Sequence, residues 1–142
     1  MSWKGGEMKE EMFVNGTEVK VDIRKTNFKE RGYDFEGSEY LVYFANDGRV
    51  FVDERADEEF VKYAALHEAI CQGAYKDLAP KCSNPNCRCF EIDKMLIGLM
   101  PYEKKGPYAI KRIKMFNLLL DKNINPAMND VFRESLEGLK KM

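Results

Sequence analysis

Alternating apolar and polar positions in the first third of the chain predict strands. Across residues 18–24, an apolar side chain at every second position alternates with a charged one, which is typical of a strand with one buried face. Asn15-Gly16, just before this stretch, is a turn signal. Residues 39–45 and 49–53 are predicted to form two further strands, joined by a hairpin turn at Asn46-Asp47-Gly48. We therefore expect a small, mostly antiparallel sheet in the N-terminal half.

A long helix is predicted after the sheet, and its apolar surface covers most of its circumference. Asp57 suits the N-cap position, and Glu58 and Glu59 suit the positive end of the helix dipole. Residues 60–75 contain few polar side chains, and a helix that is apolar on most sides is normally buried at the centre of a domain. One face of this helix carries Phe60, Ala64, His67, Cys71 and Leu78.

Three more helices are predicted in the C-terminal half, after a loop at residues 77–88. The first spans residues 90–100 and ends at Pro101, because proline cannot continue the helical hydrogen bonds. The second starts near Pro107, which suits a first helical turn, and the third covers residues 125–140. The predicted fold class is therefore α+β, with a small sheet followed by a bundle of about four helices packed on it.

Length and composition favour one soluble globular domain. The chain has 142 residues, of which 44% are hydrophobic and 33% are charged. We expect a flexible N-terminal tail at residues 1–11 and a single domain at residues 12–142. The formal net charge of −1 gives no electrostatic reason to expect a nucleic acid or a membrane surface as partner. The charged N-terminus does not resemble a signal peptide, so we expect a cytoplasmic protein whose partner is an unknown protein or peptide.

The candidate chemistry lies on the long helix. His67 is the single histidine of the chain and stands in an apolar stretch, where an unpartnered ionisable group costs roughly several kcal/mol. Cys71 follows four residues later, so both side chains lie on one helical face and reach a common ion. Imidazole nitrogen and thiolate sulfur are preferred ligands of zinc. The spacing therefore predicts a zinc site at this point of the helix.

Three more cysteines cluster in the loop that follows, at Cys82, Cys87 and Cys89. Cytoplasmic thiols are normally reduced, so clustered cysteines favour metal ligands over disulfides. A closed site would use His67, Cys71 and two of the loop thiolates, whereas a site of four cysteines would leave His67 outside. The alternatives are a hydrogen-bonded core histidine with buried apolar thiols, and disulfide pairing of the four cysteines.

The sequence around the histidine resembles a known signature. His67-Glu68-x-x-Cys71 resembles the His-Glu-x-x-His motif of the zincin metallopeptidases, with cysteine in the second ligand position. Residues 50–57 resemble the short edge strand that precedes the active helix in minimal zincins. Residues 89–93, followed by Leu99-Met100-Pro101, resemble the acidic, apolar helix of the ImmA/IrrE-type members. The resemblance extends over residues 40–101.

The resemblance implies a zincin-like fold in which His67 binds zinc and Glu68 is the general base that activates a zinc-bound water. It also implies a third ligand near the start of the following helix, where Glu91 stands. Thiolate ligands make zinc a weaker Lewis acid, and further cysteines would fill the position that substrate needs. We therefore expect a zincin-like domain with a structural zinc and a non-catalytic binding role. The alternative is a zinc-dependent metallopeptidase or other hydrolase, so the sequence leaves enzymatic activity undecided.

Overall fold

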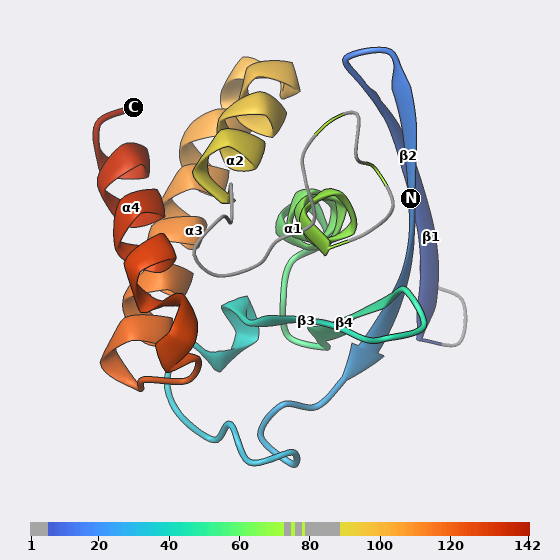
Figure 1. The fold of residues 1–142 in the computed structure, drawn as a ribbon. Coiled ribbons are helices and arrows are strands. Elements are labelled where there is room, and N and C mark those ends of the chain that lie inside the picture. The colour runs from blue at the N-terminus through green and yellow to red at the C-terminus, as the bar shows by residue number, and fades with distance from the viewer. Residues whose placement is uncertain (1–5, 73–74, 76–77, 79–88) are drawn as a thin grey trace.

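The computed structural model describes residues 6–72, 75, 78 and 89–142, and within them it has an α+β fold. A single four-stranded sheet precedes the helices, as predicted (Figure 1). In the described part of the chain, no helix combines the length and the apolar character needed to cross a membrane. The elements are β1 (Glu7–Val14), β2 (Thr17–Thr26), η1 (Ser38–Tyr40), β3 (Val42–Phe44), β4 (Arg49–Asp53), α1 (Glu58–Gln72), α2 (Cys89–Leu99), α3 (Tyr102–Asp121), η2 (Pro126–Met128) and α4 (Asn129–Lys140).

The sheet has the strand order β1-β2-β4-β3 and is mixed. β1 and β2 form an antiparallel hairpin, whose turn places Asn15 and Gly16 at φ 48° and 86°, the left-handed region that these two residue types tolerate. β4 pairs with β2 in parallel and with β3 in antiparallel orientation. β4 is thus an inner strand, whereas the resemblance to minimal zincins implied an edge strand at this place. The edge is formed by β3 instead, because the turn after Phe44 folds it back onto β4.

The predicted tail at residues 1–11 is wrong for its second half. Residues 7–11 belong to β1, which pairs along its whole length with β2. Met8 lies opposite Ile23 and is buried, so the methionines of this charged segment supply the apolar side that a strand needs. The alternation was present in the sequence, but the surrounding glutamates and lysines concealed it. Residues 1–5 lie outside the described residues.

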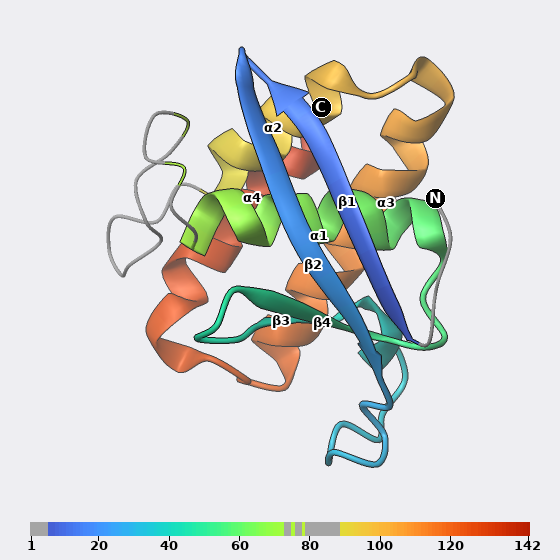
Figure 2. The same cartoon turned by 90° about the vertical axis from the view of Figure 1, so that its right-hand side faces the viewer.

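Helix α1 occupies the centre of the molecule. Figures 1 and 2 show it between the sheet on one side and α2, α3 and α4 on the other. It contacts all four strands as well as α2 and α3. Ala64 and Ala65 are fully buried, and their small side chains let neighbouring elements pack closely against the helix. The buried central helix predicted from its all-round apolar surface is confirmed.

Helix α3 begins five residues earlier than the sequence predicts. The expected start was near Pro107, but the structure starts the helix at Tyr102 with Pro101 in the N-cap position. The N–H of Lys104 donates to the carbonyl of Pro101, which closes the first turn. Pro107 then lies in the second turn, where its missing N–H removes one hydrogen bond without ending the helix.

The N-cap of α1 gives a first testable prediction. Asp57 Oδ1 accepts a hydrogen bond from the N–H of Phe60 at 2.9 Å, and Asp57 also forms an ion pair with Lys111 of α3. We expect Asp57→Ala to lower the free energy of unfolding by about 1 kcal/mol, because an unsatisfied helix N-terminus replaces the cap. Asp57→Asn keeps the cap and loses only the ion pair, so we expect a smaller loss in urea denaturation. Equal losses in both variants would show that Lys111, rather than the cap, dominates.

Candidate metal centre

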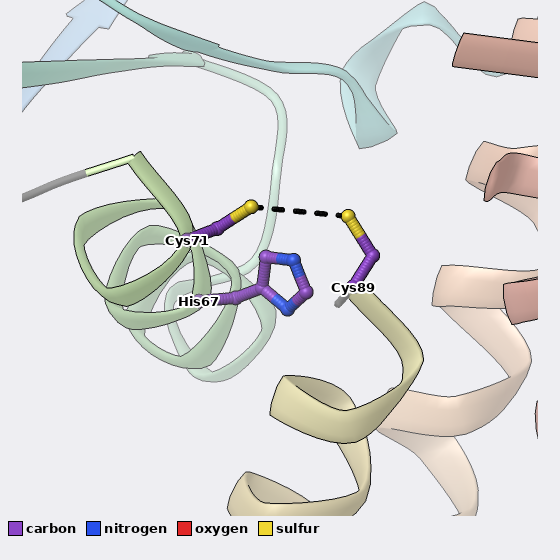
Figure 3. Close-up of side chains that lie close together, drawn as sticks. All are labelled: His67, Cys71 and Cys89. Atoms are coloured by element: carbon purple, nitrogen blue, oxygen red, sulfur yellow. Dashed lines mark hydrogen bonds between the residues drawn. The ribbon is translucent and has the colours of Figure 1, made fainter. Parts of the chain in front are cut away.

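Three potential metal ligands converge where α1 meets the start of α2. His67 and Cys71 lie one turn apart on α1, and Cys89 is the first residue of α2. All three are buried, and their ligand atoms lie within 4.8 Å of one another, so this group could hold a metal ion. In Figure 3 one ring nitrogen of His67 faces the two sulfurs. The sequence placed Cys89 in a loop; the structure places it at a helix start, on a rigid element.

The sulfurs of Cys71 and Cys89 are 3.9 Å apart, roughly twice the length of a disulfide bond. These two residues are therefore not joined by a disulfide. A separation near 3.9 Å is compatible with two sulfurs that bind one tetrahedral ion at about 2.3 Å each. The geometry excludes the disulfide alternative for this pair and agrees with the ligand alternative.

The orientation of His67 is set by Asp93 of α2. Nδ1 of His67 lies 2.9 Å from Oδ1 of Asp93, and because that carboxyl is ionised, Nδ1 is the donor. This leaves Nε2 as the nitrogen that faces the sulfurs. Nε2 is buried and has no hydrogen-bond partner among the described residues. A histidine that donates through one nitrogen to a carboxylate and binds metal through the other is a frequent arrangement in zinc proteins.

Asp93 is itself held by two residues of α3. The hydroxyl of Tyr108 donates to Oδ1 at 2.9 Å, and Nε of Arg112 donates to Oδ2 at 3.1 Å. All of these side chains are buried. Burial alone would raise the pKa of Asp93, but the charges of Arg112 and His67 outweigh it and lower the pKa to about 2. The network therefore fixes a carboxylate behind the imidazole at neutral pH.

The network and burial shift the pKa values of the three candidate ligands in different directions. Burial lowers the pKa of His67, but the adjacent Asp93 carboxylate raises it to about 9. The hydrogen bond from Cys71 lowers the pKa of Cys89, and the neighbouring His67 lowers it further. Burial opposes both effects. The same hydrogen bond and burial raise the pKa of Cys71. The metal-free site thus pairs an imidazolium with one thiolate, and a metal cation would replace the shared protons.

The remaining predicted site residues are placed differently. Glu68 lies beside the three ligands, is partly buried, and accepts a hydrogen bond from Gln72 Nε2 at 2.7 Å. Burial raises its pKa. Glu91, the third ligand implied by the resemblance, is exposed on α2 and does not belong to the group. Cys82 and Cys87 lie outside the described residues.

Sequence reasoning missed the residues that support His67. Asp93 lies near the start of α2, where the helix dipole favours an exposed acid, but it is fully buried because its face of α2 packs on α1. Tyr108 and Arg112 were not singled out at all. A signal existed, since Cys89 and Asp93 are four residues apart, as are Tyr108 and Arg112, so each pair lies on one helical face.

A cavity of about 590 Å³ opens beside the three ligands. His67, Cys71 and Cys89 line it together with Glu68 and Arg112. The rest of its wall is mostly apolar and comes from the segment before β3, from β3 itself, from α3 and from α4. The candidate metal centre is therefore accessible to a small molecule rather than sealed in the core.

Comparison with known proteins adds no family to this description, since no family model matches the chain and no curated protein or solved structure is significantly similar to it.

Proposed function

We propose that this protein is a zinc-binding domain whose metal is structural. The observation that carries the proposal is the convergence of His67 Nε2 with the sulfurs of Cys71 and Cys89, all buried. One nitrogen and two sulfur donors favour zinc over the hard cations, which prefer oxygen. The Asp93 carboxylate behind His67 supports the same assignment, because it orients the ring and raises its basicity as a ligand.

The proposal includes a fourth ligand from the segment between α1 and α2. Cys82 and Cys87 stand there, and the segment leads directly to Cys89, the first residue of α2. A third thiolate would close the coordination sphere, and three thiolates would make zinc a poor Lewis acid. For this reason we assign a non-catalytic binding role, towards a protein or another partner that is not yet identified.

A zincin-like arrangement is part of the same proposal. The motif His67-Glu68-x-x-Cys71 lies on the central helix that follows the sheet, and the next helix supplies a further ligand. Cys89 takes the role that the resemblance gave to Glu91, which lies two residues after Cys89 on α2. These placements support the resemblance, while the inner position of β4 does not follow from it.

Metal analysis of the purified protein tests the proposal. We expect elemental analysis to find zinc in equimolar amount, and X-ray absorption to count three sulfurs and one nitrogen around it. His67→Ala and Cys71→Ser should each reduce the zinc content, whereas Glu91→Ala on the exposed side of α2 should not. Zinc-free protein, or zinc that is retained in both ligand variants, would overturn the proposal.

A second candidate function is zinc-dependent hydrolysis. It is favoured by one observation, the position of Glu68 on the same cavity as the three ligands. Bound zinc would supply an acidic water, and Glu68 would accept the proton of that water if the fourth position were open. Burial raises the pKa of Glu68, which makes its carboxylate a stronger base.

Glu68→Gln separates the two functions. If the protein is a hydrolase, we expect the variant to lose at least a hundredfold in kcat on a peptide substrate while it keeps its zinc, because general base catalysis contributes about 10²–10⁴-fold. If the zinc is structural, neither wild type nor variant cleaves peptides, and both have similar melting temperatures. Four protein ligands in the X-ray absorption spectrum would eliminate hydrolysis.

A further inference from the structure

Arg112 has more hydrogen-bond donors than the described residues accept from. Arg112 is 1% exposed to solvent, and it lines the cavity. Nε donates to Asp93, and Nη1 donates to the sulfur of Met115 at 3.3 Å, a weak acceptor. No described residue accepts a hydrogen bond from Nη2. Because Arg112 lines the cavity, a ligand in the cavity can bring an acceptor to the guanidinium.

Apart from Glu68 and the three candidate ligands, most of the cavity wall around this cation is apolar. Phe116 stacks beneath the guanidinium at 4.9 Å from ring centre to carbon, and Phe28, Leu41 and Phe132 are further buried members of the lining. Leu119 and Met128 line the cavity as well. A volume of about 590 Å³ is within the range of small-molecule sites. The cavity therefore joins a long apolar wall to one buried cation.

We propose that this cavity binds a small monocarboxylic acid with an apolar body, whose carboxylate accepts hydrogen bonds from the Arg112 guanidinium. A planar guanidinium fork matches a carboxylate with two parallel hydrogen bonds. The apolar body lies against Phe28, Phe116 and Phe132 and is removed from water. This inference goes beyond the zinc site, because it requires Arg112 and the apolar wall but no metal ligand.

The polar groups of the cavity favour a small acid over a peptide. A peptide would bring one amide N–H and one carbonyl per residue, and each needs a partner when it is buried. The uncharged polar side chains of the lining are Thr26, Tyr33, Tyr43, Gln72 and Asn125. Thr26 already accepts from Arg31, and Gln72 already donates to Glu68. An aliphatic or aromatic body needs none of these groups.

Calorimetric titration of the purified, metal-loaded protein with decanoate tests the inference. We expect saturable binding of decanoate, and at least tenfold weaker binding of decan-1-ol, which has the same body without the charge. Arg112→Lys keeps the positive charge next to Asp93 but loses the fork, so it should weaken decanoate binding at least tenfold. The matched control is Arg133→Lys, since Arg133 is exposed on α4 outside the cavity and should matter less than twofold.

A second variant leaves the charged network intact. Met128→Trp narrows the cavity from η2 and should abolish decanoate binding, whereas Ile110→Trp on the exposed face of α3 should not. The inference is overturned if decan-1-ol binds as tightly as decanoate, if Arg112→Lys behaves like Arg133→Lys, or if an acetylated apolar tripeptide binds more tightly than decanoate. A sample that contains zinc but binds no decanoate overturns this inference alone, and zinc-free protein that binds decanoate overturns the zinc proposal alone.

Discussion

Removal of the metal by a chelator is expected to lower the melting temperature by about 15 °C or more. Structural zinc contributes its binding free energy directly to folding, because the unfolded chain has no preformed site. Without zinc, the three buried ligands His67, Cys71 and Cys89 share protons in place of the metal, and the free energy of the metal bonds is lost from the folded state. Calorimetric scans with and without chelator, followed by addition of zinc, measure the shift and its reversal.

Two variants of helix α2 provide the control for this experiment. Cys89→Ser removes a ligand, so it should melt like the chelated wild type, and chelator should then have no further effect. Glu91→Ala changes an exposed acid two residues away and should keep both the metal and the full chelator-induced shift. A wild-type melting temperature that chelator leaves unchanged would contradict a structural metal.

Asp93→Asn is expected to cost about 3–5 kcal/mol of the free energy of unfolding and about 10–100-fold in zinc affinity. The side chain keeps its shape but loses its charge, so Arg112 becomes an uncompensated buried cation and His67 loses its ionised partner. Urea denaturation measures the stability, and competition with a zinc indicator measures the affinity. The two measurements together distinguish a positioning role for Asp93 from a purely structural one, because a structural role would leave the affinity of the folded protein unchanged.

Tyr108→Phe is the matched control for Asp93. It removes one hydrogen bond to the same carboxylate and leaves both the ion pair and the contact with His67 in place. We expect a loss of about 1.5–3 kcal/mol in stability and little change in zinc affinity. If Tyr108→Phe reduced the affinity as much as Asp93→Asn does, the carboxylate charge would not be what orients the imidazole.

Local pattern explains how much of the fold was predictable. The alternation in β2 and the Asn15-Gly16 turn act over a few residues, so the sequence placed them correctly. The N-cap at Asp57 is equally local, and its hydrogen bond to the backbone is present. The start of α3 was predicted too late. Pro101 takes the N-cap position and Pro107 is tolerated in the second turn, and neither proline alone shows at which of the two the helix begins.

For the metal centre, the sequence by itself determined which atoms are available: one imidazole and one thiol a turn apart on a helix too apolar to be exposed. Only the tertiary structure decided what joins them. Cys89 and Asp93 reach His67 because α2 packs against α1, and Arg112 reaches Asp93 because α3 packs beside both. Spacing along one helix fixes a face, whereas contacts between helices depend on how those faces pack, and no single segment of sequence carries that information.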